Sequence, residues 1–109
     1  MSDPLGHRSR TFAIDYDGTW SADPVAFRGF ASELRARGHR VLLITARVSG
    51  HGEVNRECLD HVDRVLFSGA EYKREYAARF GETVDIWIDD NPGMIGPDIS
   101  IDGGIAGPS

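Results

Sequence analysis

Short apolar segments recur along this chain, and each is followed by a stretch with helical spacing. Residues 11–14, 41–44, 65–67 and 84–88 are the segments that we expect to form strands. The run 41–44 is apolar at every position, which is typical of a strand buried on both faces of a sheet. Alternation of strands with helices predicts an α/β fold, in which a parallel sheet with right-handed crossovers lies between two helical layers. We therefore expect a three-layer, Rossmann-like domain.

Three helices are expected between these strands. The first begins where Asp23 can act as an N-cap, with Pro24 at the first helical position, and it ends at Gly38. Apolar residues fall on one face of that helix at the spacing of 3.6 residues per turn. The stretch 53–61 has a weaker helical pattern, and the stretch 71–80 carries Tyr72, Tyr76, Ala77 and Phe80 on one face.

The chain has 109 residues, which is the length of one domain. We expect the domain to span residues 11–102, with a flexible tail over 1–10 and a flexible, glycine-rich tail over 103–109. Residues 99–101 are expected to add an edge strand, which makes a sheet of about five strands. Trp20 is expected to pack under the turn that follows the first strand, and Trp87 to lie in the core.

Composition narrows the function classes. The formal net charge of −5 argues against a protein that binds nucleic acid along its length. A single cysteine, Cys58, excludes an internal disulfide and favours a reducing, cytoplasmic setting, where we expect the thiol to be buried. No apolar run approaches the roughly 20 residues that a membrane-spanning helix needs. We therefore expect no membrane association.

Polar residues follow three of the expected strands at their carboxyl ends. These are Asp15 and Asp17 after the first strand, Thr45 after the second, and Asp89 and Asp90 after the last. Ligands of open α/β sheets bind outside the carboxyl ends of the strands, so these side chains are expected to share one crevice. Four carboxylates in one place require a cation, and oxygen ligands favour Mg²⁺.

Four motifs in this order resemble those of the haloacid dehalogenase superfamily. The first is an apolar strand that ends in Asp-x-Asp-Gly-Thr, the second a strand that ends in Thr, the third a lysine early in a helix, and the fourth a strand that ends in paired acids. In this chain they are Phe12 to Thr19, Leu42 to Thr45, Lys73, and Ile86 to Asp90. Each motif is weak by itself, and their conjunction carries the resemblance, which extends from Phe12 to about Pro92.

The resemblance implies a Mg²⁺-dependent phosphatase that forms an aspartyl-phosphate. It implies that Asp15 is the nucleophile, Asp17 the general acid and base, Thr45 a donor to the phosphoryl group and Lys73 its counter-charge. Asp89 and Asp90 would hold Mg²⁺ together with Asp15 and Asp17, with Asp90 favoured as the direct ligand. The remaining candidates for contact with phosphate or substrate are Tyr16, Gly18, Ala46 and Arg47.

Members of this superfamily commonly carry a cap domain, and this chain has no room for one. Only residues 20–23 separate the first motif from the helix that follows, so we expect an open crevice. An open crevice suits a bulky phosphorylated substrate, and a second subunit could also cover it. The residues after the second motif, Arg47, Ser49 and His51, are as consistent with substrate contact as with a polar surface loop.

Two alternatives to a general phosphatase stay open. One is a non-catalytic phosphate- or metal-binding interaction module on the same fold. The other is a phosphatase that acts on the 3′ ends of nucleic acid, which the net charge disfavours. A calcium loop of the EF-hand type is excluded, because Trp20 and Ala26 stand where that loop needs glycine and glutamate.

Overall fold

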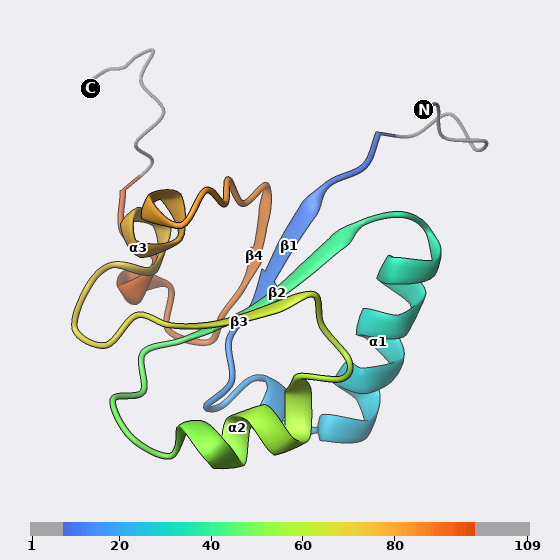
Figure 1. Ribbon diagram of the computed structural model, residues 1–109, viewed down its shortest axis with the longest axis horizontal. Coiled ribbons are helices and arrows are strands. Elements are labelled where there is room, and N and C mark those ends of the chain that lie inside the picture. The colour runs from blue at the N-terminus through green and yellow to red at the C-terminus, as the bar shows by residue number, and fades with distance from the viewer. Residues whose placement is uncertain (1–7, 98–109) are drawn as a thin grey trace.

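The computed structural model describes residues 8–97, which form an α/β fold around a four-stranded, all-parallel sheet (Figure 1). The strand order is β3-β2-β1-β4. The strands are β1 (Thr11–Ile14), β2 (Arg40–Thr45), β3 (Arg64–Phe67) and β4 (Ile86–Ile88). The helices are α1 (Pro24–Ala36), α2 (His51–Cys58) and α3 (Lys73–Arg79), with short 3-10 helices η1 (Trp20–Ala22) and η2 (Pro92–Met94). The Rossmann-like α/β class expected from the sequence is confirmed.

The order of the strands determines where the ends of the strands meet. The chain builds β1, β2 and β3 in one direction across the sheet and then returns to place β4 on the other side of β1. Ile14, the last residue of β1, lies beside Leu43 of β2 and Ile88 of β4. The sheet order therefore reverses between β1 and β4, and such switch points are where ligands bind in open α/β sheets.

Two apolar clusters cover the two faces of the sheet, which gives three layers. The first cluster joins strand residues such as Ile14 and Val41 to residues of α1 and α2, among them Leu34 and Val54. The second joins strand residues such as Ala13 and Leu42 to Ala77 of α3. Every residue of β2 after Arg40 is buried, as its unbroken apolar run predicted.

The ends of α1 follow the expected capping pattern. The Asp23 carboxylate accepts a hydrogen bond from the Ala26 N–H at 3.1 Å, and Pro24 occupies the first helical position. Gly38 has a φ of +88°, which suits the residue that ends a helix. These two signals position the helix that leads from β1 to β2.

The other boundaries differ from the sequence expectation by a few residues. The second helix begins at His51 rather than at 53 and ends at Cys58, because Leu59 and the residues after it form the turn into β3. The third helix covers Lys73–Arg79 instead of 71–80. The last strand is shorter than 84–88, since only Ile86–Ile88 pairs with β1.

The sheet has four strands in the part of the chain that is described, against about five expected. The fifth strand expected at 99–101 lies outside those residues, as do most of the two expected tails. Ser9 and Arg10 are described, and the Arg10 N–H donates to Nδ1 of His39 at 3.0 Å.

Several expected core positions are buried, and others are not. Trp20 and Cys58 are fully buried, as predicted, whereas Trp87 is only half-buried beside the second cluster. Tyr72 and Phe80, which were expected on one face of the third helix, flank α3 and are 46% and 43% exposed. No helix among residues 8–97 is long and apolar enough to cross a membrane.

Candidate active site

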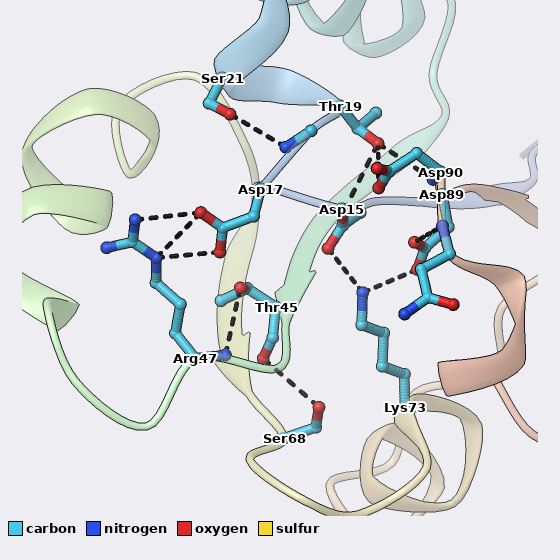
Figure 2. Close-up of polar contacts among 12 residues, drawn as sticks. Asp15, Asp17, Thr19, Ser21, Thr45, Arg47, Ser68, Lys73, Asp89 and Asp90 are labelled. Carbon is cyan, nitrogen blue, oxygen red and sulfur yellow. Dashed lines mark hydrogen bonds and ion pairs between the residues drawn. The ribbon is translucent and has the colours of Figure 1, made fainter.

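The polar residues that follow the strands gather at one edge of the sheet (Figure 2). Asp15 continues β1, and its N–H donates to the Ile88 carbonyl at 2.9 Å, which aligns it with the end of β4. Thr45 is the last residue of β2, and Asp89 and Asp90 come directly after β4. Parallel pairing of these neighbouring strands therefore places residues that are far apart in sequence side by side.

An open cavity of about 310 Å³ lies at this edge. Eight of the ten candidate residues from the sequence line it, together with Asn91 and Met94: Asp15, Asp17, Thr45, Ala46, Arg47, Lys73, Asp89 and Asp90. Tyr16 and Gly18 do not line it. Tyr16 is buried and its hydroxyl lies 3.1 Å from Glu57, while the Gly18 N–H donates to the Ser21 hydroxyl.

Lys73, at the start of α3, is the only lysine in the chain and is 2% exposed. Its ammonium lies 2.6 Å from Oδ1 of Asp15 and 2.7 Å from Oδ2 of Asp89. One buried cation thus holds the acidic residues of two neighbouring strands together. Ion pairs removed from water in this way are directional and charge-assisted, so they fix the carboxylates relative to one another.

The Asp15 carboxyl is nearly inaccessible, at 7% exposure. Burial raises the pKa of Asp15 to about 6, against the opposing effect of the Lys73 ammonium. Asp89 lies nearby and also raises that pKa by charge repulsion. The Lys73 ammonium therefore offsets only part of what opposes ionisation of Asp15.

A divalent cation fits this arrangement. Asp15, Asp89 and Asp90 each offer a carboxylate oxygen, and these oxygens lie within 4.8 Å of one another. When all three are ionised, three carboxylates face one ammonium, and the two remaining negative charges equal the charge of one divalent ion. Oxygen donors from few protein ligands favour Mg²⁺, which retains several waters in its shell.

The Asp90 carboxylate is fixed by Thr19 and bordered by Gly18. The Thr19 hydroxyl donates to Oδ1 of Asp90 at 3.3 Å and accepts from the Asp90 N–H at 3.2 Å. Gly18 has a φ of +81°, and a Cβ placed on it would lie 2.2 Å from Oδ2 of Asp90. A glycine is therefore needed here both for the backbone conformation and for the space that Asp90 occupies.

Asp17 lies in the cavity wall, but its side chain is not one of the three clustered carboxylates. Arg47 makes a forked ion pair with it, with Nε 3.0 Å from Oδ2 and Nη2 3.0 Å from Oδ1. Nη1 of the same guanidinium lies 3.2 Å from Oε1 of Glu53. The sequence did not predict this pairing.

Thr45 is 1% exposed and lines the cavity. Its hydroxyl oxygen accepts the Arg47 N–H at 3.3 Å, which leaves the hydroxyl hydrogen to point elsewhere. Its carbonyl accepts from both the N–H and the hydroxyl of Ser68, at 2.8 and 3.3 Å. The end of β2 is thereby fixed to the loop after β3.

Some residues of the site were not singled out from the sequence. Thr19 stands inside the first motif and Asn91 beside the paired acids, so proximity to a motif was a usable signal for both. Glu53 and Met94 carry no such signal, because one is an exposed helix residue and the other a residue of η2.

Comparisons of this chain with protein-family models, with curated proteins and with solved structures found no match in any of the three. The class that the fold defines is an α/β domain with a parallel sheet and a polar crevice at its carboxyl edge.

Proposed function

We propose that this protein is a Mg²⁺-dependent phosphohydrolase of the haloacid dehalogenase type that cleaves phosphomonoesters. The observation that carries the proposal is the position of Asp15. It directly follows β1, one of the two interior strands, contacts the buried Lys73 ammonium, and clusters with the acids that follow β4. A carboxylate between a fixed cation and a cation-binding cluster is well placed to attack a phosphoryl group, because both cations offset the charge of the incoming phosphate.

Bound Mg²⁺ would neutralise phosphoryl oxygens and orient the phosphorus toward Asp15. Asp15, Asp89 and Asp90 would hold it. Asp90 is the preferred direct ligand, because both oxygens of Asp89 are already engaged. Oδ2 of Asp89 pairs with Lys73, and Oδ1 accepts the Asn91 N–H at 2.9 Å. The backbone carbonyl of Asp17 is proposed as a further ligand.

In the first step the Asp15 carboxylate oxygen attacks phosphorus, and the bond between phosphorus and the ester oxygen breaks. The leaving alkoxide takes a proton from Asp17 and departs as an alcohol. The Thr45 hydroxyl donates to one phosphoryl oxygen and the Lys73 ammonium balances the charge of another. The product of this step is an aspartyl-phosphate on Asp15.

In the second step Asp17, now ionised, removes a proton from water. The resulting oxygen nucleophile attacks the same phosphorus, and the bond between phosphorus and Asp15 breaks. Inorganic phosphate is released, Asp15 is again a carboxylate and Asp17 is again protonated. In the structure Asp17 is a carboxylate paired with Arg47, so it must leave the fork and take up a proton from solvent before the first turnover.

The substrates are expected to reach the site without a cap domain. Only residues 15–23 join β1 to α1, and only residues 68–72 join β3 to α3. These are the two places at which a cap would be inserted. A bulky phosphorylated substrate, including a nucleic-acid end, can approach an open crevice of this kind, and a second copy of the chain could also cover it.

Release of inorganic phosphate tests the proposal. The purified protein is incubated with metabolite phosphates, nucleotides, 3′-phosphorylated oligonucleotides and phosphopeptides, in Mg²⁺ and in EDTA. We expect turnover only with Mg²⁺, and none from Asp15→Asn. Asp60→Asn is the matched control, because Asp60 is exposed and makes no ion pair among residues 8–97, and this variant should retain wild-type rates.

Two outcomes would overturn the proposal. Turnover that survives in Asp15→Asn would show that Asp15 is not the nucleophile. Binding of Mg²⁺ and phosphate with no turnover across the whole panel would favour an interaction module instead.

A further inference from the structure

Arg47 presents an arginine fork to the cavity, and a carboxylate already occupies that fork. Two of its nitrogens, Nε and Nη2, bond both oxygens of Asp17 at 3.0 Å. This is the bidentate geometry with which arginine recognises carboxylate and phosphate groups. Asp17 therefore shows what kind of group the fork accepts.

The fork is held in place by contacts that do not depend on Asp17. Oε1 of Glu53 binds the third nitrogen, Nη1, at 3.2 Å, and the guanidinium carbon lies 5.1 Å from the centre of the Tyr16 ring. Tyr16 is itself 3% exposed and anchored near Glu57. The guanidinium is thus oriented by α2 and by the buried ring, and only one of its edges faces Asp17.

The fork is separate from the place where the transferred phosphoryl group would sit. Lys73 contacts Asp15 and Asp89, whereas the guanidinium of Arg47 contacts Asp17 and Glu53 and neither of those acids. In Figure 2 Arg47 and Lys73 lie on opposite sides of Thr45 and Asp15. Both residues nevertheless line the same open cavity.

We propose that the Arg47 fork binds a second anionic group of the substrate, a carboxylate or a second phosphate near the scissile ester. The proposal rests on the proposed function, since Asp17 vacates the fork when it turns toward the leaving oxygen. The anionic group of the substrate then replaces the Asp17 carboxylate at Arg47. An emptied fork would leave a guanidinium in the wall of the cavity with Glu53 as its only carboxylate, and an anionic substrate restores its second partner.

The consequence is a substrate class. Phosphomonoesters that carry a second oxyanion are favoured over esters of the same size with a neutral organic part. The selectivity comes from the leaving group, because Arg47 contacts the part of the substrate that departs as an alcohol.

Matched substrate pairs test this inference. One pair is phosphoglycolate and ethyl phosphate, which distinguishes a carboxylate; the other is thymidine 3′,5′-bisphosphate and thymidine 3′-monophosphate, which distinguishes a phosphate. We expect kcat/KM of the wild type to favour the member that carries the second anionic group in at least one pair by about tenfold or more. Arg47→Gln should reduce that ratio to about two or less, and Arg47→Lys should recover part of it, because it restores the charge without the fork.

Arg56→Gln is the control for loss of a positive charge. Arg56 also belongs to α2, is exposed, and has no ion pair among the described residues, so its replacement should leave the ratio unchanged. A purely structural role for Arg47, in which it only holds Asp17, would lower kcat equally for both members of a pair. An unchanged ratio in Arg47→Gln would therefore overturn the inference while the phosphatase activity stands.

Binding provides the readout if turnover is absent. The affinities of the same pairs are measured by calorimetry with Asp15→Asn, alone and combined with Arg47→Gln, in Mg²⁺. The proposal is supported if the protein prefers the more anionic member of a pair and if Arg47→Gln removes that preference. Equal affinities in both backgrounds overturn it. Failure of every substrate to turn over concerns the proposed function instead, so the two results are distinguishable.

Discussion

Gly18 combines two constraints that normally occur at different residues. Its φ of +81° strains any side chain, and the space next to it is filled by the Asp90 carboxylate. Only the second constraint concerns the acidic cluster that is proposed to bind Mg²⁺.

Gly18→Ala separates these effects when it is compared with Gly38→Ala. Both positions have positive φ, but among the described residues no atom lies within 4 Å of a Cβ on Gly38. We expect each substitution to lower the free energy of unfolding by about 1 kcal/mol or more. Only Gly18→Ala should also weaken Mg²⁺ binding, as measured by calorimetry, because Asp90 has to turn away. Wild-type affinity in Gly18→Ala would contradict this account.

Lys73→Met should destabilise the metal-free protein strongly. The substitution leaves Asp15 and Asp89 buried beside one another without their shared cation. Breaking a buried ion pair by removal of one partner costs about 3–5 kcal/mol. Urea unfolding in EDTA measures the loss, and Mg²⁺ should recover more stability in this variant than in the wild type. If the variant is as stable as the wild type in EDTA, Lys73 does not balance these charges.

At the scale of the elements, Glu82 links the starts of two strands at the far end of the sheet. It follows α3, is 8% exposed, and pairs with Arg40 of β2 at 2.7 Å and with Arg64 of β3 at 3.0 Å. The hydrogen bond from Arg40 lowers the pKa of Glu82, more than its burial raises it. The ionised form of the Glu82 side chain is therefore more stable in the folded protein than in the unfolded chain.

The pH dependence of stability follows from the sign of that shift. A lowered pKa in the folded state contributes stability that is present above the ordinary glutamate pKa of about 4.5 and is lost as the pH falls below it. Glu82→Gln should accordingly lower the urea midpoint at pH 7 and change it much less at pH 3. Glu33→Gln is the control: Glu33 of α1 pairs with Arg37, the residue after that helix, both side chains are exposed, and such pairs contribute little. If Glu82→Gln lowers the urea midpoint equally at pH 7 and pH 3, ionised Glu82 is not the source of this stability.

The bounds of a helix or strand could be predicted from the sequence where capping residues or an unbroken apolar run mark them. Asp23, Pro24 and Gly38 mark both ends of α1, and the apolar run of β2 is buried throughout. The ends of α2 and α3 were less predictable, because their limits depend on where the chain turns toward the next strand. The Arg47 pairing with Asp17 and Glu53 was not predictable, since it needs the relative positions of the β1 loop, the β2 loop and α2.

At the scale of the whole molecule, the proposed metal site joins the first and last strands of the sheet. Asp15 follows β1 and Asp89 and Asp90 follow β4, so one bound ion would connect segments from opposite ends of the domain. These three acids could be predicted from sequence motifs, because each follows a strand and parallel strands place their carboxyl ends at the same edge of the sheet. The three-layer packing around them follows from the same alternation of strands and helices.

Mg²⁺ should therefore raise the melting temperature of the whole domain. At a concentration of one hundred times its Kd, a ligand of the folded state adds about 2.7 kcal/mol. For a domain of this size that corresponds to about 10 °C or more. Differential scanning fluorimetry in Mg²⁺ and in EDTA measures the shift, which should be absent in Asp90→Asn and retained in Asp60→Asn. A shift that persists in Asp90→Asn would place the ion elsewhere.

The chain carries eleven arginines and one lysine, and that lysine is enclosed between β1 and β4. Acylating reagents attack the neutral amine of lysine and leave guanidinium groups untouched, so Lys73 offers them the only side-chain amine in the chain. Because the side chain is 2% exposed and paired with two carboxylates, its acylation rate should report how often the structure opens locally around it. Mass spectrometry of the modified peptide would follow those events in the unlabelled protein, and any ligand that ties the carboxylates together should slow them.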